Sequence, residues 1–366
     1  MSENEFILQM QPCFGAEEKQ ALCDDMDQGG FVTEYRQTAL FEQRIAEYVG
    51  ARHCVVVNNG TLSLSLTALA CGLSSGDEVI VPNYTMIATP NSVKLFGIEP
   101  VFVDVEPESL CLNLQCVEAA ISEKTKAIML VSANGRYPLA GIEGFERLAR
   151  ERDLWLIEDA AQSLGSRYPD GRHMGTAGHL GSFSFSSPKI ISTGQGGCVV
   201  TDDDALAAKL RKLKDFGRQQ AGTDRHDMLG LNCKFTDIQA CIGLAQMEKL
   251  PARVERKKAI YRRYRQQLEG LPQLQFFQQD LQCTTPWFID VMVEQREELI
   301  AHLKAQKIGS RVMYPPINKQ AAYSVAGEHP ISNAVGDGGL WLPSASQLSD
   351  KEIDRICATI RQYYTP

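Results

Sequence analysis

Short apolar, β-rich runs alternate with helix-length segments from residue 54 onward, and this alternation constrains the fold more than any other feature. We expect strands at 54–57, 78–82, 101–105, 127–131, 154–157, 181–185 and 197–201. Amphipathic stretches separate most of these runs, at 61–70, 90–96, 115–121 and 145–152. Continuous apolar strands separated by helices indicate a mostly parallel sheet that is covered on both faces. No helix fits between the last two strands, so that pair is expected to be antiparallel or joined by a long crossing loop.

The chain of 366 residues is long enough for about two domains. After Asp202 the pattern becomes helical, with helices expected at 205–215, 236–250 and 253–268, and Gly270-Leu-Pro272 marks a break. The remainder has the pattern of a smaller α+β unit, with a strand at 287–293 and helices at 296–306 and 349–363, the last opened by a Ser-x-x-Glu capping box. We therefore predict a large α/β domain with an N-terminal arm over residues 1–250 and a small α+β domain over 251–366.

Composition and charge argue against several classes of protein. The net charge is −8, from 37 basic and 45 acidic residues, and the basic run 253–265 is interpreted as a solvated helix face rather than a nucleic-acid patch. The eleven cysteines include no C-x-x-C pair and the histidines no H-x-x-x-H, which predicts reduced thiols and no metal site. The acidic N-terminus is unlike a signal peptide, and the uncharged stretch 54–76 reads as a buried strand and helix rather than a membrane span. A cytoplasmic protein is expected.

Two side chains suit the chemistry of an aldehyde cofactor. Lys189 lies between an apolar run and the glycine-rich turn Gly194-Gln-Gly-Gly197, and Asp159 ends the run that begins at Leu154. A desolvated lysine has a lowered pKa, is nucleophilic and can form a Schiff base, while an acid can keep a pyridine nitrogen protonated. Asp159 is expected at the carboxyl end of its strand, where α/β sheets bind ligands, with Glu158 on the opposite side. The alternatives are a surface lysine after a strand and an acid that begins the next helix.

Asn59-Gly60-Thr61 follows a strand and opens a helix, which predicts a phosphate site. Backbone N–H groups and the positive end of the helix dipole favour an anion there, and glycine permits close approach. Hydroxyl side chains at 184, 186, 187, 192 and 193 near Lys189 could also serve a phosphate. A plain strand-to-helix turn is the alternative. The turn 194–197 is neither a Walker motif nor a dinucleotide fingerprint, which argues against an NAD-type dehydrogenase.

These residues occur in a combination that resembles the sugar-nucleotide aminotransferases of the DegT/DnrJ/EryC1/StrS family, which are fold-type I pyridoxal-phosphate (PLP) enzymes. The likeness runs over nearly the whole chain, and within the family the chain looks closest to the perosamine-synthase-like members. The motifs that carry it are Asn59-Gly-Thr61, Gly76-Asp-Glu-Val-Ile-Val-Pro82, Val101-Phe-Val-Asp104, Ile157-Glu-Asp-Ala-Ala-Gln-Ser163, Phe183-Ser-Phe185, Lys189, Thr193-Gly-Gln-Gly-Gly197 and Leu340-Trp-Leu-Pro-Ser344. The implied fold is a large domain with a mostly parallel seven-stranded sheet and a smaller C-terminal domain.

The resemblance also implies a role for each matching residue. Lys189 would hold PLP as a Schiff base and carry the proton, and Asp159 would pair with the pyridinium nitrogen. The other implied cofactor contacts are Gly60, Thr61 and Ser184 at the phosphate, Gln162 near the phenolic oxygen, Met86 at the position that stacks on the ring, and Asn232 reaching the phosphate of the other subunit. A homodimer with shared active sites would follow.

The resemblance implies transfer of an amino group, from glutamate through pyridoxamine phosphate, onto a nucleotide-linked keto-deoxy sugar for surface polysaccharides such as O-antigen. The first candidate is the C4 ketone of GDP-4-keto-6-deoxymannose. The alternatives are C3 or C4 amination of dTDP- or UDP-4-keto-6-deoxyglucose, and a non-catalytic nucleotide-sugar sensor. Lys189 argues against the sugar 3-dehydratases, which carry histidine there.

The chain departs from the family pattern around the substrate side. Met86 stands where an aromatic residue is common, with Tyr84 expected to point the other way, and Ser132-Ala-Asn-Gly-Arg-Tyr137 replaces a His-x-Tyr-Gly motif. Asn318 replaces a histidine and Lys234 an arginine. Four arginines are candidates for substrate phosphates, with ion-paired or solvated side chains as the alternative: Arg136, Arg218, Arg225 and Arg311.

Overall fold

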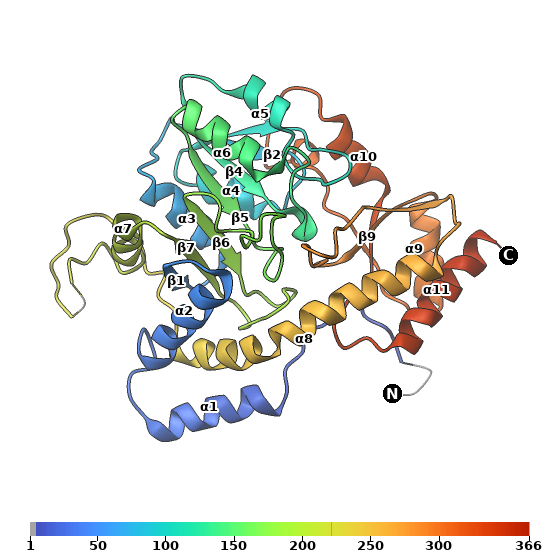
Figure 1. The fold of residues 1–366 in the computed structure, drawn as a ribbon, viewed down its shortest axis with the longest axis horizontal. Coiled ribbons are helices and arrows are strands. Elements are labelled where there is room, and N and C mark those ends of the chain that lie inside the picture. Colours follow the sequence, from blue (N-terminus) through green and yellow to red (C-terminus); the bar gives the residue numbers. More distant parts are fainter. Residues whose placement is uncertain (1–4, 221, 366) are drawn as a thin grey trace.

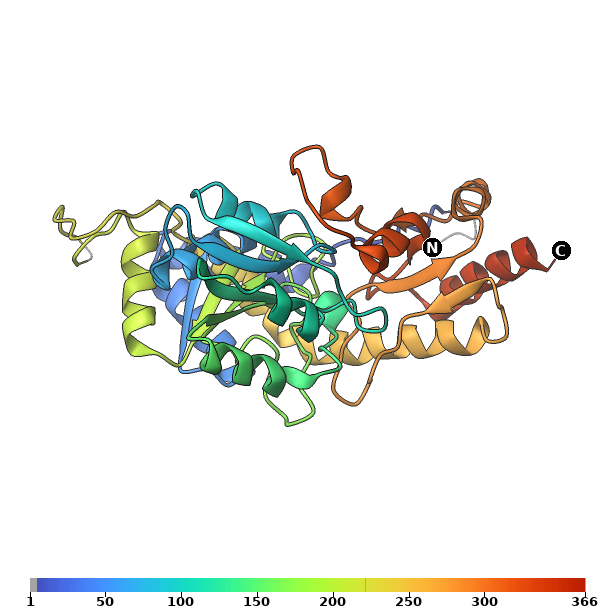
Figure 2. The same ribbon diagram turned by 90° about the horizontal axis from the view of Figure 1, so that it is seen from above.

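The computed structural model describes residues 5–220 and 222–365. Two lobes lie side by side, a large one built on a seven-stranded sheet and a small one built on a four-stranded sheet. The long helix α8 (Asp237–Gln267) runs beneath both lobes (Figures 1 and 2). The predicted fold class is confirmed, and the acidic start at residues 1–4 lies outside the described residues.

The large sheet has the strand order β1-β7-β6-β5-β4-β2-β3. Its strands are β1 (His53–Val57), β2 (Glu78–Pro82), β3 (Glu99–Val103), β4 (Thr125–Val131), β5 (Trp155–Asp159), β6 (Leu180–Ser184) and β7 (Gly197–Thr201). Neighbouring strands from β3 through β2, β4 and β5 to β6 are parallel, whereas β7 is antiparallel to both β6 and β1. Of the two arrangements expected for the last pair, the structure has the antiparallel one. The third strand begins two residues earlier than expected.

Helices cover both faces of this sheet, as strands apolar on both sides require. One face packs against α3 (Gly60–Ala70), α4 (Ala88–Lys94) and α7 (Asp204–Lys214). The other packs against α2 (Arg36–Val49), α5 (Leu114–Ala120), α6 (Gly141–Glu151) and α8. Successive strand residues alternate between the two cores, for example Val56 in one and Val57 in the other. The uncharged stretch 54–76 is therefore a buried strand and helix, as expected.

The expected division between helices 236–250 and 253–268 is wrong, because α8 continues through Pro251. A proline inside a helix removes one backbone hydrogen bond and costs about 3 kcal/mol or more. The flanking residues Leu250 and Val254 are buried in the large-lobe core, and Ile260 is buried in the small-lobe core, which offsets that cost. The predicted domain boundary at residue 250 falls inside this helix.

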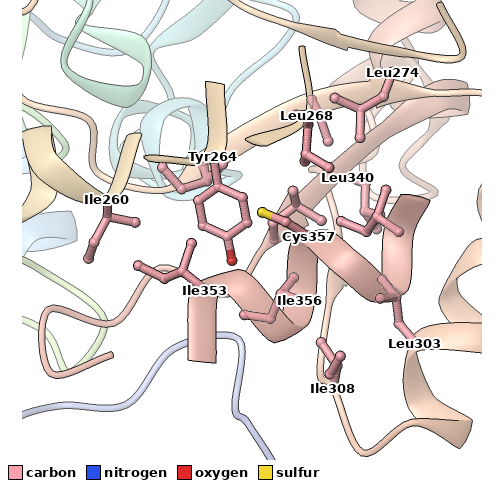
Figure 3. Close-up of a cluster of buried hydrophobic side chains, with 14 of the residues drawn as sticks. Ile260, Tyr264, Leu268, Leu274, Leu303, Ile308, Leu340, Ile353, Ile356 and Cys357 are labelled. Atoms are coloured by element: carbon pink, nitrogen blue, oxygen red, sulfur yellow. The ribbon is translucent and has the colours of Figure 1, made fainter. Parts of the chain in front are cut away.

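The small lobe packs its sheet on α8 and two further helices. Its elements are β8 (Leu274–Phe276), β9 (Ile289–Val293), α9 (Arg296–Ala305), β10 (Arg311–Val312), α10 (Pro330–Gly338), β11 (Gly339–Leu342) and α11 (Asp350–Tyr364). Figure 3 shows the core between them, which includes Tyr264 of α8, Leu268 just after that helix, and Ile353, Ile356 and Cys357 of α11. The capping box predicted at Ser349 and Glu352 opens α11.

The N-terminal arm contains α1 (Ala16–Gln28) and then α2, neither of which the sequence pattern predicted. Figure 1 shows α1 lying along α8, and an ion pair between Lys249 and Glu18 joins them at 2.6 Å. The eleven cysteines, all within the described ranges, are free thiols. Among the described residues, the helices are too short or too polar to cross a bilayer.

Candidate active site

Lys189 lies in the loop between β6 and β7, at the edge of the sheet where the parallel strands end. Its side-chain nitrogen is placed 4.1 Å from the centre of the Trp287 ring. Burial lowers the Lys189 pKa to about 8, because the surroundings solvate an ammonium less well than water does, and the carboxylate of Asp159 opposes this shift. Lys189 is therefore a more available nucleophile near neutral pH than an ordinary lysine.

Asp159 is the last residue of β5 and is 6% exposed. Its Oδ2 accepts a hydrogen bond from Thr89 Oγ1 at 2.8 Å, and its Oδ1 accepts one from the Ala161 N–H at 3.2 Å. Burial raises the Asp159 pKa, while these hydrogen bonds and the positive charge of Lys189 lower it. A cationic ring nitrogen placed beside this carboxylate would favour its ionised form further.

Glu158 points to the opposite side of the strand, as expected from the period of two. Its carboxylate is fully buried and accepts hydrogen bonds from Tyr168 Oη at 2.6 Å and from the N–H groups of Gly175, Ala177 and Gly178. These four donors organise the loop that leads into β6. Glu158 is thus a structural carboxylate, and Asp159 is the one that faces the lysine.

The start of α3 lies against β6 and forms a cradle for a small anion. Asn59 caps the helix through a 2.9 Å bond from the Leu62 N–H to its Oδ1, and the helix geometry leaves the N–H groups of Gly60 and Thr61 free of intrahelical acceptors. A Cβ on Gly60 would come within 2.8 Å of Ser184 Cβ. Glycine is therefore required here, and Ser184 Oγ lies beside the helix N-terminus.

Gln162 is held by the loop that follows β4. Its Oε1 accepts a 2.7 Å hydrogen bond from the N–H of Asn134, which has a left-handed backbone with φ of 53°. Asn134 in turn exchanges two side-chain hydrogen bonds with the backbone of Phe288, at 2.6 and 2.9 Å. Because the Gln162 oxygen is occupied, its NH₂ group is the end free to donate to a ligand.

Met86 and Asn232 are exposed, although both are predicted to contact the cofactor. Met86 is 43% exposed, and its carbonyl accepts the N–H of Thr89, the residue that contacts Asp159. Tyr84 is 4% exposed and packs beside Tyr314. The two side chains thus point apart as expected. Asn232 is exposed on the segment after α7, next to Cys233, whose carbonyl accepts the Asn58 N–H.

Most of the four arginines that were candidates for substrate phosphates are ion-paired or solvated instead. Arg218 pairs with Asp215 and Asp224. Arg225 and Arg311 are exposed, and the guanidinium of Arg311 lies 5.5 Å from the centre of the Trp341 ring. Arg136 is 3% exposed and forms a two-pronged ion pair with Asp290, at 2.8 and 3.2 Å. The suggestion that Arg136 meets a substrate phosphate is therefore wrong, because both terminal nitrogens of its guanidinium already donate to the carboxylate of Asp290.

We expect Arg136→Met to lower the free energy of unfolding by about 3–5 kcal/mol, because Asp290 would be left buried without a partner. Urea denaturation measures this change. A second replacement, Asp290→Leu, should return part of the loss, since the apolar pair no longer strands a charge. An Arg136→Met protein as stable as the parent would contradict the prediction.

The basic run 253–265 is only partly the solvated face that was expected. Arg253 is 8% exposed and donates to the carbonyl oxygens of Ile190 and Cys13, and Lys257 is 2% exposed. The expectation failed because α8 runs along both lobes, so its face toward them is buried whatever its charge. Arg262 and Arg265 remain exposed, as expected.

Sequence reasoning missed two residues that contact the lysine and the acid. Thr89 reaches Asp159 from the first turn of α4, and the i, i+4 pair Thr85 and Thr89 is joined by a 2.8 Å hydrogen bond. Trp287 comes from the small lobe, where the expected strand at 287–293 carried no mark of function. The observed strand β9 begins at Ile289, so Trp287 lies just before it, and a tryptophan at the first position of the expected run was the available signal.

A desolvated lysine, a buried carboxylate and a helix N-terminus therefore lie together at this edge of the sheet. Enzymes that use a phosphorylated aldehyde cofactor need these three groups. The chain belongs to the DegT/DnrJ/EryC1/StrS aminotransferase family, whose profile matches residues 13–361. It is a PLP-dependent aminotransferase.

Relatives match over the whole length of the chain. A GDP-perosamine synthase of Escherichia coli O157:H7 is 35% identical, covering 98% of this chain and 99% of its own. A GDP-perosamine synthase of Vibrio cholerae is 32% identical, covering 97% of this chain and 98% of its own. Among solved structures, DesV of S. venezuelae in complex with a ketimine intermediate has a TM-score of 0.90 at 31% identity, covering 96% of this chain and 95% of that one.

Proposed function

We propose that this protein transfers an amino group from glutamate to the C4 ketone of GDP-4-keto-6-deoxymannose, in the synthesis of a surface polysaccharide such as O-antigen. The pairing of Lys189 with Asp159 beside the α3 cradle carries the catalytic part of this proposal. The sugar is supported by the two GDP-perosamine synthases, which resemble the chain from end to end.

The donors at the sheet edge fit PLP. In this proposal the N–H groups of Gly60 and Thr61 and the hydroxyl groups of Thr61 and Ser184 hold the phosphate, and Asp159 receives the pyridinium N–H. Gln162 Nε2 donates to the phenolic oxygen, and its amide is already oriented for this by Asn134. Met86 covers the ring, and Asn232 completes the phosphate site of a second subunit.

When bound, PLP supplies an aldehyde that condenses with amines and a ring that withdraws electrons from the neighbouring carbon. Asp159 keeps the proton on the ring nitrogen, which this withdrawal requires. Lys189 Nζ would take the proton from the α-carbon of the donor, hold it as an ammonium and give it up again within the same half-reaction, and would move a proton in the reverse direction with the sugar. A Lys189 pKa of about 8 suits both directions near neutral pH.

Exposed apolar side chains support the homodimer in this proposal. They gather on the N-terminal arm, on the first turn of α8 and on the segment between α7 and α8, which projects from the large lobe in Figures 1 and 2. The residues are Phe14, Met26, Phe31, Val32, Leu40, Phe216, Leu229 and Ile238. Leu229 is 93% exposed, and it lies three residues before Asn232, the residue expected to reach a second subunit. A cytoplasmic location belongs to the same proposal, since the nucleotide-linked sugar would be met there.

The test of the substrate starts from the pyridoxamine-phosphate form of the enzyme, mixed with GDP-, UDP- and dTDP-linked 4-keto-6-deoxy sugars. We expect the GDP sugar to restore the visible absorbance of the aldehyde form fastest, and NMR of the product to show an amine at C4. Faster recovery with a dTDP or UDP sugar would replace the proposed substrate. Binding of a GDP sugar by a protein that never acquires a visible chromophore would favour a sensor instead.

A further inference from the structure

Trp287 contacts the Lys189 segment with both the face and the edge of its indole. The face lies 4.1 Å from Lys189 Nζ, and the indole N–H donates a 2.8 Å hydrogen bond to the carbonyl of Pro188, the preceding residue. Trp287 is 4% exposed and stacks on Phe288, with ring centres 3.8 Å apart. The ring is thus fixed on one side by its own lobe and on the other by the lysine loop.

The contact with the ring face favours the charged form of Lys189. The face of an indole carries partial negative charge, and its attraction for an ammonium is strongest where water is displaced. Asp159 also favours the ammonium, whereas burial opposes it. Tyr314, whose pKa burial and Asp159 both raise, is an uncharged neighbour of Asp159, and the guanidinium of Arg311 lies over Trp341 rather than over Trp287.

Lys257 of α8 holds the backbone of Trp287 in place. Its side-chain nitrogen donates hydrogen bonds to the carbonyl oxygen of Trp287 and, at 2.5 Å, to that of Ser344. Lys257 is 2% exposed, and burial lowers its pKa to about 7. A buried lysine whose partners are backbone carbonyls is costly, since the charged form is poorly solvated. Its position ties α8 to the segments that precede β9 and follow β11.

We propose that Trp287, anchored by Lys257, is the resting place of the Lys189 ammonium whenever that lysine is not bonded to the cofactor. Both act as positioning residues, because they hold Lys189 Nζ beside Asp159 rather than react themselves. This inference rests on the proposed role of Lys189. A lysine that must leave and return once in each half-reaction is held at one place instead of sampling its rotamers.

The test measures the rate at which acetic anhydride acetylates Lys189 in the full-length, cofactor-free protein between pH 6 and 10, by peptide mass spectrometry. Tryptophan carrying one, two or three fluorine atoms replaces Trp287 site-specifically, which weakens the negative ring face while nearly preserving its shape. We expect the midpoint of the pH profile, near 8 in the parent, to fall stepwise by about 0.5–1 pH unit in total. A midpoint that does not move with fluorination would overturn the proposal.

Substitutions test the two positions separately. Trp287→Phe keeps an aromatic face and should shift the midpoint less than Trp287→Leu, while Trp155→Phe, at a tryptophan packed on His179, should leave it unchanged. Lys257→Met fills the same space without its hydrogen bonds, and we expect a downward shift of the Lys189 midpoint. A Lys257→Met protein with the parent midpoint would remove Lys257 from the proposal.

Failure of this inference and failure of the proposed function give different results. A protein that binds PLP and transaminates but shows an unmoved acetylation midpoint overturns the inference alone. A protein that never transaminates, yet shows the stepwise shift, overturns the proposed function and keeps the contact between Trp287 and Lys189.

Discussion

Replacement of Lys189 by alanine is expected to lower turnover by at least about 10³-fold and to remove the visible absorbance of the Schiff base between this lysine and PLP. The lysine supplies both the amine that holds the aldehyde and the group that moves the proton, and general acid–base catalysis alone contributes about 10²- to 10⁴-fold. Single-turnover absorbance changes with glutamate, followed by product analysis with the keto sugar, measure the two losses separately.

Lys351→Ala provides the matched control, because Lys351 is exposed on the first turn of α11, outside the active site. It should retain the parent spectrum and turnover. If Lys189→Ala still completed both half-reactions at the parent rate, the assignment of Lys189 would be wrong. Rescue of the slow variant by added small amines would show that the missing group is a base at this position.

Asp159→Asn is expected to reduce turnover by roughly 10³-fold, within the range for loss of a preorganised charge at the reacting centre. The amide has nearly the same shape and can keep the contact with Thr89, but it cannot hold a proton on a pyridine nitrogen. We expect the variant to bind PLP, with its absorption shifted toward that of the unprotonated ring. Titration of the bound chromophore and pre-steady-state kinetics measure these changes.

Asp153→Asn is the control for this substitution, because Asp153 is exposed just before the same strand and has a left-handed backbone, with φ of 53°, that asparagine also tolerates. It should behave as the parent does. An Asp159→Asn enzyme with unaltered spectrum and turnover would separate this carboxylate from the cofactor. The acetylation midpoint of Lys189 should also fall, since the carboxylate favours the charged form of the lysine.

Local patterns were sufficient for the sheet and for the lysine–acid pair. The period of two placed Glu158 and Asp159 on opposite sides of β5, and a loop too short for a helix left an antiparallel pair as one of two arrangements expected for β6 and β7. Such features depend on residues near one another in the sequence. Gly60 and Ser184 were placed at one phosphate by the family resemblance alone, and the structure brings the two residues close together.

Features that depend on the packing of the two lobes were not predicted. Pro251 suggested a break, but the burial of α8 residues on both sides of it overrides that signal. The charge of the basic run gave no sign that Arg253 and Lys257 are buried, which happens because one face of α8 packs on the two lobes. Arg136 could be assigned only once Asp290, 154 positions later, was seen to face it. No local periodicity encodes partners at that distance.

The path of α8 has a consequence for attempts to reduce this enzyme to a minimal cofactor-binding module. The helix packs in the cores of both lobes, and the indole over the catalytic amine belongs to the second lobe. A chain shortened at Pro251 would lose Lys257, Trp287 and the hydrogen bonds between the Asn134 side chain and the Phe288 backbone together. The smallest autonomous catalyst derivable from this scaffold is therefore nearly the whole chain, and new substrate specificity is better sought in the loops at Met86 and Asn318 than in domain exchange.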